Sequence, residues 1–122
     1  MFGLFQRPKL EASFTASEAV SNEFTREIDL AGRLVLTNAG SDADLSNVEM
    51  MIVAGFRRIP LDVPPAWRSL HLPKGQSKSD DVRWKLTLDS PLRAQAGELF
   101  VGGQDQKRQT WQWRLPFTFE LR

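Results

Sequence analysis

The chain has 122 residues, no cysteine, and 16 Lys and Arg residues against 15 Asp and Glu, for a formal net charge of +1 at pH 7. This length suits one domain with its own core, and the lack of cysteine excludes disulfides, thiolate nucleophiles and cysteine-based metal sites. The charges are interspersed, whereas nucleic-acid binders need clustered basic residues to neutralise phosphates, so we expect no nucleic-acid partner.

Residues 1–8 are predicted to be a short N-terminal tail, and residues 9–122 a single domain. The apolar residues Phe2, Leu4 and Phe5 form too short a run for a signal peptide, and no stretch of the chain approaches the ~20 apolar residues of a membrane span. We therefore predict a cytoplasmic protein without a membrane span. The tail aromatics are expected to pack on their own domain; the alternative is that they dock on a partner or a membrane surface.

The first half of the domain alternates between apolar and polar residues. Lys9 to Ala16 and Ile28 to Leu36 both have a period of two, which is typical of strands with one buried face. Between them, Thr15 to Glu18 has the spacing of a helix capping box and predicts one or two helical turns. Val48 to Phe56 is apolar on both faces, which predicts a central strand or one whose outer face is covered by a loop or a partner.

The second half contains four further candidate strands. They are Arg68 to Leu72, Val82 to Leu88, Glu98 to Val101 and Trp111 to Leu121. In the last of these, Pro116 cannot donate a backbone hydrogen bond and indicates an edge position or a bulge. Gly102-Gly103 is interpreted as the hairpin turn before this final strand, because a phosphate-binding loop would need a helix to follow it.

Together these segments predict about seven short strands separated by turns, with no long helix. This pattern favours an all-β fold, an immunoglobulin-like antiparallel β-sandwich, over a parallel α/β sheet.

The sequence offers little for catalysis. His71 is the single histidine, and Ser69 lies on the same face of its short strand, but nothing around Ser69 resembles a nucleophile elbow. We expect His71 to be an ordinary surface or edge residue. The chain is therefore predicted not to be an enzyme, with no catalytic residues, no metal and no cofactor.

Four loop aspartates leave calcium binding open as an alternative. Asp42 and Asp44 lie in one loop, and Asp80 and Asp81 in another. Calcium takes six to eight oxygen ligands, so two such loops could contribute to a site if they met at one end of a sandwich. Solvated turn aspartates are the more common case, and we favour that interpretation.

The four tryptophans invite comparison with sugar-binding domains. Trp84, Trp111 and Trp113 lie on the apolar phase of their strands and are expected in the core. Trp67 follows Pro64-Pro65-Ala66 in a loop and is the best candidate for exposure.

Three arginines accompany Trp67 as candidate partner-contact residues. Arg57 and Arg58 follow the apolar Val48–Phe56 segment, and Arg68 follows Trp67 itself. Together they could form a small basic and aromatic surface for a protein partner. The alternative, which we favour slightly, is a solvated strand end.

The order of several segments resembles a known family. Leu30-Ala-Gly-Arg-Leu-Val-Leu-Thr-Asn, the apolar Val48–Phe56 strand and Val82-Arg-Trp-Lys-Leu-Thr-Leu-Asp-Ser-Pro are similar to the N-terminal half of bacterial arrestin-like proteins of the sporulation-control family. The chain departs from that family in having one sandwich rather than two, and in Asp89-Ser90-Pro91 replacing the usual Leu-Pro ending. The resemblance implies an arrestin-like fold and a cytoplasmic, non-enzymatic adaptor.

The sequence thus predicts an interaction or adaptor module that contacts another protein through a strand edge or a surface patch. Two alternatives stay open: a sandwich that binds calcium or carbohydrate, and a structural subunit of a larger assembly. A homo-oligomer is compatible with any of these.

Overall fold

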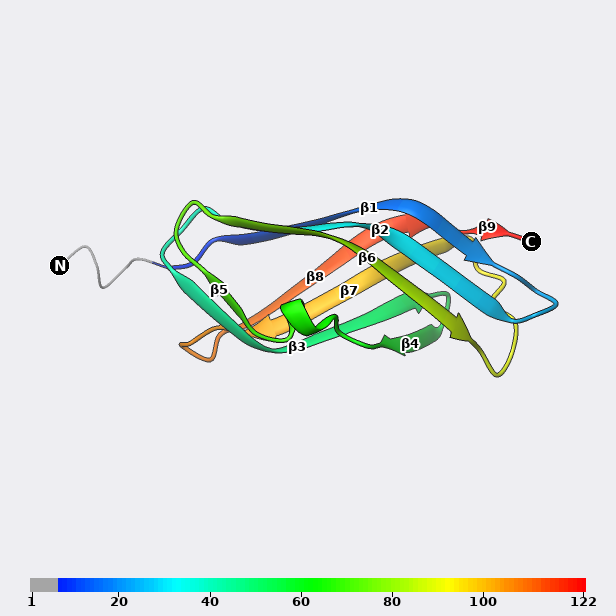
Figure 1. Ribbon diagram of the computed structural model, residues 1–122. Helices are drawn as coiled ribbons and strands as arrows, with labels where there is room; N and C mark the ends of the chain where they lie inside the picture. The colour runs from blue at the N-terminus through cyan, green and yellow to red at the C-terminus, as the bar shows by residue number, and fades with distance from the viewer. Residues whose placement is uncertain (1–6) are drawn as a thin grey trace.

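The computed structural model describes residues 7–122, which form nine strands and one short 3₁₀ helix in two packed layers (Figure 1). The strands are β1 (Leu10–Ser21), β2 (Glu27–Asn38), β3 (Ala43–Ala54), β4 (Arg57–Leu61), β5 (Leu70–Leu72), β6 (Ser77–Thr87), β7 (Ala96–Gln104), β8 (Thr110–Thr118) and β9 (Glu120–Leu121), and the helix is Pro65–Trp67. The all-β sandwich is confirmed. The interpretation of Phe2, Leu4 and Phe5 lies outside the described residues.

The two sheets differ in their strand order. Sheet I has the order β6-β2-β1-β9, and sheet II has the order β4-β3-β7-β8, with β5 also paired to β3. All pairs are antiparallel except β9, which runs parallel to β1. The strand count exceeds the predicted seven because the chain adds β4 after the β3 turn and splits its last segment into β8 and β9.

The core lies between the sheets and is built from the alternating residues. Leu30 and Leu34 of β2 face Ile52 of β3 and Leu99 of β7, and all four are fully buried. The period of two in the sequence therefore marks the buried faces correctly. Each such side chain removes apolar surface from water and contributes about 1.5–3 kcal/mol to the free energy of unfolding.

The predicted helical turn at Thr15 to Glu18 is wrong. These residues belong to β1, which pairs with β2 from Leu10 to Ser21 with one register shift between Ala16 and Glu18. A capping box satisfies the free N–H groups at the start of a helix. Here the pairing with β2 provides partners for the backbone of this segment, so the strand continues through it.

The prediction of a central strand at Val48 to Phe56 is correct, but its end is misplaced. β3 lies between β7 on one side and β4 and β5 on the other, so both edges are paired. The strand ends at Ala54, and Gly55 turns the chain with φ +58°. Phe56 is therefore in the turn and fully exposed. The outward residues Met51 and Val53 are half-buried.

Gly102 and Gly103 do not form the predicted hairpin turn. Both lie inside β7, opposite Gln112 and Trp111 of β8. A Cβ on Gly103 would stand 2.9 Å from the Leu45 side chain, so close packing against β3 requires glycine there.

The hairpin between β7 and β8 is instead organised by Asp105, whose side chain is buried. Its carboxylate accepts hydrogen bonds from the backbone N–H groups of Lys107 (2.8 Å) and Gln109 (3.0 Å) and from Nε1 of Trp111 (3.1 Å). One side chain thus holds both the turn and the first tryptophan of β8.

The last segment leaves one sheet for the other. β8 is the outer strand of sheet II, as Pro116 predicts, and the chain then crosses at the buried Phe119. β9 pairs with β1 in sheet I, with Val20 opposite Glu120 and Ser21 opposite Leu121. The single long strand predicted from Trp111 to Leu121 is therefore two strands in two different sheets.

Candidate interaction edge

The outer edge of β6 is the longest strand edge among residues 7–122 that has no paired residue. β6 pairs with β2 on one side and with no strand of residues 7–122 on the other. Residues 62–68 run beside this edge from the other sheet (Figure 1), and a hollow of about 910 Å³ lies between the two. An unpaired strand edge presents N–H and C=O groups that another strand can bind.

The other outer strands are poorer templates for strand addition. β4 is short and contains Pro60, β8 contains Pro116, and β9 has two residues. A proline cannot donate to a ladder, and a short strand offers few bonds. The outer edge of β1 is paired with β9 only at Val20 and Ser21, but β8 of the other sheet contacts β1 as well, with the rings of Phe14 and Phe117 6.0 Å apart. β6 has 11 residues, no proline and no paired residue on its outer edge, so it is the edge best able to accept a strand.

Two tryptophans fix the segment that borders the hollow. Nε1 of Trp84 in β6 donates to the carbonyl of Asp62 at 2.8 Å, and Nε1 of Trp67 donates to Oδ2 of Asp80 at 2.8 Å. Pro64 and Pro65 restrict the backbone at the start of the short 3₁₀ helix, and this turn directs the Trp67 side chain toward the core. The segment is thus hydrogen-bonded to β6 near both of its ends, and it lines the opposite side of the hollow.

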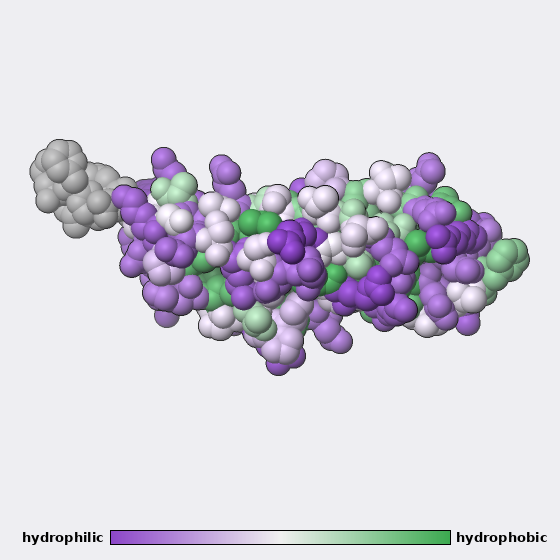
Figure 2. Space-filling view, turned by 45° about the horizontal axis from the view of Figure 1, so that its top comes forward, coloured by the Kyte–Doolittle hydropathy of each residue, from purple (hydrophilic) through white to green (hydrophobic). Residues whose placement is uncertain are grey.

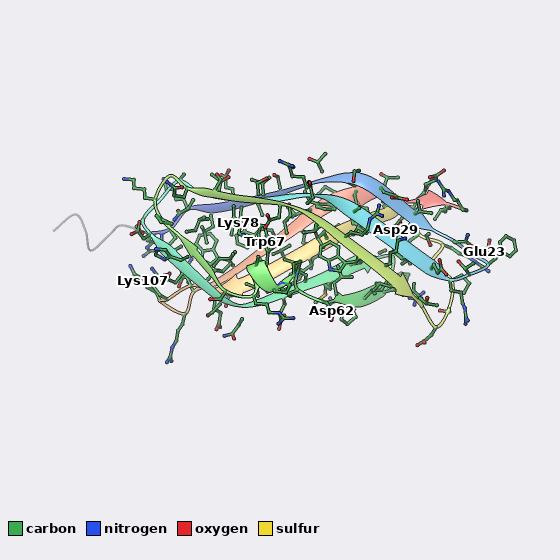
Figure 3. The ribbon with its side chains drawn as sticks, in the orientation of Figure 1. Glu23, Asp29, Asp62, Trp67, Lys78 and Lys107 are labelled. Atoms are coloured by element: carbon green, nitrogen blue, oxygen red, sulfur yellow. The ribbon has the colours of Figure 1, made fainter. Side chains whose placement is uncertain are left out.

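The prediction that Trp67 is exposed is wrong. Its side chain is 2% exposed, and it packs in the core below β6, with the Lys78 ammonium 5.6 Å from its ring centre (Figure 3). The proline-rich loop that suggested exposure is the element that folds the ring back between the sheets. Trp67 therefore lines the hollow and contributes to the core.

The basic and aromatic patch predicted around Trp67 is not assembled. Arg57 donates to the carbonyls of Ser90 (2.9 Å) and Pro91 (3.3 Å), and Arg68 donates to Val63 at 3.4 Å. Arg58 is exposed on the outer face of β4, opposite Val53. Of the four predicted contact residues, Trp67 and Arg68 border the hollow, and the two others do not.

Charged side chains cover the outward face of sheet I next to this edge. Asp81 pairs with Arg33 of β2 at 3.2 Å, and Arg83 pairs with Glu18 and, at 3.6 Å, with Asp29. The side chains of Asp81 and Arg83 are 80% and 51% exposed. Figure 2 shows that hydrophilic side chains dominate this side of the molecule, with hydrophobic atoms in narrow strips between them.

Asp80 accepts hydrogen bonds from both Lys78 and Trp67, and its pKa is lowered from the usual value. The hydrogen bond from the Lys78 ammonium lowers the pKa of Asp80, burial opposes this, and the Trp67 indole N–H lowers it further. A carboxyl whose pKa is lower in the folded state stabilises the fold above its unfolded pKa of about 3.9, and this contribution disappears as the pH falls through the folded pKa.

We therefore expect Asp80→Asn to flatten the acid limb of the stability curve. Below about pH 4 the wild type loses the Asp80 contribution, whereas the variant has no carboxyl to protonate at this position. Urea unfolding midpoints at several pH values, with ¹³C-carboxyl NMR of Asp80, measure both quantities. An Asp80 carboxyl that titrates at or above its usual pKa contradicts this expectation.

The remaining candidate residues are dispersed over separate contacts. Asp42 accepts from the backbone N–H of Lys74 at 2.9 Å, and Asp44 contacts Nδ1 of the exposed His71 across the β3–β5 pair. Asp80 and Asp81 lie in β6, where they contact Trp67 and Arg33 respectively. The four aspartates therefore do not form one site. Within residues 7–122 no three His, Cys, Asp or Glu side chains are grouped as metal ligands.

The tryptophans of β8 are intermediate cases. Trp84 is buried, as predicted, whereas Trp111 and Trp113 are half-buried against the core. Their rings stack at 6.0 Å between centres and 15° between planes.

The uncovered edge of β6 could not be recognised from its residues alone. One feature of the sequence does indicate an edge strand. Lys78 and Asp80 lie on the inward face of β6, and inward-pointing charges are a common feature of edge strands. The position of residues 62–68 beside that edge depends on tertiary contacts of Trp67 and Trp84, which have no local signature.

Comparison with known proteins supports the fold. No protein-family model and no curated protein matches the chain. A protein from Bordetella pertussis, provisionally named ApaA, superposes with a TM-score of 0.62 at 16% identity, covering 95% of this chain and 96% of that one. A second structural-genomics target gives a TM-score of 0.54 at 11% identity, covering 92% and 85%.

A third similar structure is a β-glucosidase from Erythrobacter marinus, with a TM-score of 0.44 and 15% identity. The match covers 88% of this chain but 15% of the glucosidase. At 16% and 11% identity, the likeness to the first two structures concerns the fold alone. The resemblance to sporulation-control arrestins is not tested by these comparisons and stays a prediction. No helix in residues 7–122 is long and apolar enough to cross a membrane.

Proposed function

We propose that the protein is a non-enzymatic interaction module that binds a protein strand along the free edge of β6. The observation that carries this proposal is the 11-residue edge without proline, which borders a hollow held open by residues 62–68. Strand addition is a common mode of peptide recognition, in which backbone hydrogen bonds supply affinity and neighbouring side chains supply specificity.

The chemistry of the hollow is consistent with this mode. Val63, Pro64 and Ala66 offer apolar surface on the inner side of the edge, while Asp81, Arg83 and Lys85 offer charges on the outer side. A bound strand would alternate its side chains between these two surfaces. The family resemblance supports an adaptor role in the cytoplasm, without any catalytic residue.

Photo-crosslinking in the producing cells tests the proposal. A photoreactive amino acid at Lys85, whose side chain is 69% exposed on β6, is expected to give discrete protein adducts. The same group at Arg114, which is exposed on the outward face of β8, is the matched control and should give none. Adducts from position 114 alone, or from neither position, would refute binding at the β6 edge.

Amide hydrogen exchange then distinguishes strand addition from a side-chain contact. Bound partner should slow exchange along residues 79–86, because their outward N–H groups become hydrogen-bonded. Unchanged exchange in this segment with the partner bound would contradict strand addition.

A further inference from the structure

Resting on the proposed use of the β6 edge, we propose that the strand it binds is β6 of a second copy of this chain. The two β6 strands run antiparallel about a twofold axis at Val82. Sheet I of one copy thereby joins sheet I of the other copy into one continuous sheet. The order of charges on β6 and the geometry of antiparallel pairs favour this arrangement.

In a twofold antiparallel pair, opposed residues must lie on the same face of the sheet. The axis therefore passes through a residue position, and each choice of that residue fixes every opposed pair. With the axis at Val82, Asp81 of each copy lies opposite Arg83 of the other. Opposite charges in directly opposed positions favour a register, and like charges disfavour it.

The neighbouring registers place like charges together. An axis at Asp81 opposes the two Asp81 side chains, and an axis at Arg83 opposes the two Arg83 side chains. An axis at Trp84 sets Arg83 against Lys85, which are both cations. The sequence Asp81-Val82-Arg83 is thus self-complementary in one register of this segment.

The charges already present in each copy extend this pattern. Asp81 is paired with Arg33 at 3.2 Å, and Arg83 is paired with Glu18 on β1. Across the junction the outward face would therefore read Glu18, Arg83, Asp81 of the second copy and Arg33 of the second copy, with alternating sign. Because Asp81 is 80% exposed and Arg83 51% exposed, both can contact a neighbour without leaving their own partners.

The inner side of the edge fits the same register. The residue at the axis is Val82 in both copies, so an apolar side chain faces its equivalent. The hollow of about 910 Å³ beside Val82 and Trp84 leaves room on this side for the approaching copy. The contact consists of one strand pair with exposed ion pairs, which are individually weak. The dimer should therefore form reversibly, and the dimeric fraction should increase with protein concentration.

Sedimentation velocity from micromolar to millimolar protein tests the proposal by charge exchange. We expect the wild type to dimerise with rising concentration and Asp81→Arg or Arg83→Asp alone to be monomeric, since each opposes like charges. An equimolar mixture of the two variants should restore dimers, because each arginine then lies opposite an aspartate. Arg114→Asp, an exposed change on β8, should leave dimerisation unchanged, and circular dichroism melting of each variant verifies the fold.

Cysteine pairing provides a second measurement of the register in this cysteine-free chain. Mild oxidation of Asp81→Cys mixed with Arg83→Cys should give a covalent heterodimer in higher yield than either variant alone. A wild type that stays monomeric at millimolar concentration, or a mixture that restores no dimer, overturns the inference. If Lys85 crosslinks a different protein in that case, the proposed use of the edge stands; if it crosslinks nothing, both fail.

Discussion

Replacing Trp67 by alanine is expected to lower the free energy of unfolding by about 3–5 kcal/mol, the usual cost of truncating a buried large aromatic residue. The ring is 2% exposed, and its loss would leave a cavity below β6 and remove one of the two partners of Asp80 Oδ2, the other being the Lys78 ammonium at 3.1 Å. Urea unfolding followed by far-UV circular dichroism measures this change.

Trp67→Phe is the matched control. It keeps most of the apolar volume but removes the indole N–H that bonds Asp80, so we expect a loss of about 1–2 kcal/mol. If Trp67→Ala costs no more than a typical surface substitution, about 0.5 kcal/mol, the ring is not the structural support described here. The hollow beside β6 would then have no fixed wall.

Asp105→Ala should have the next largest effect, a loss of about 2–4 kcal/mol, because hydrogen bonds to a buried carboxylate are strong and their donors lose a partner. The donors are the backbone N–H groups of Lys107 and Gln109 and the Trp111 indole. Thermal unfolding by calorimetry measures the loss, and the Trp111 Nε1–H NMR signal reports the broken contact.

Asp105→Asn retains one side-chain oxygen and should fall between the wild type and alanine. Asp89→Ala, at an exposed position in the β6–β7 loop, is the surface control and should stay within about 0.5 kcal/mol of the wild type. Equal stability of Asp105→Ala and Asp89→Ala would show that Asp105 does not organise the β7–β8 hairpin.

The strands could be predicted from the sequence because burial on one face leaves a local signal. The alternation from Ile28 to Leu36 and from Val82 to Leu88 is produced by the same pleat that buries these side chains. The doubly apolar Val48–Phe56 segment likewise predicts a central strand or one whose outer face is covered, and β3 is central in sheet II. In these segments the local pattern and the tertiary environment agree.

The errors arise where local patterns and tertiary contacts differ. Thr15 to Glu18 has the residues of a helix start, but pairing with β2 decides its conformation. Gly102 and Gly103 resemble a turn, although both lie inside β7 and the small size of Gly103 is needed for packing against Leu45. Trp67 follows prolines that usually mark exposed loops, and two long-range hydrogen bonds bring its segment back onto β6.

The sequence suggests a strand edge as a contact surface but does not say which strand provides it. A strand edge is one of the two surfaces that the sequence suggests, and β6 is the long strand without proline whose outer edge has no paired residue. The other surface, around Arg57, Arg58 and Trp67, could not form once the ring was buried. Which strand is outermost is a property of sheet order, and sheet order is not encoded within any single strand.

The crossing of the chain from β8 to β9 also sets the order of events during synthesis. Val20 of β1 pairs with Glu120 of β9, two residues separated by almost the whole domain. Pairing across so long a loop is slow to form, and it cannot begin on the ribosome before residue 121 has left the exit tunnel. Until then the outer backbone groups of Val20 and Ser21 lack their sheet partner.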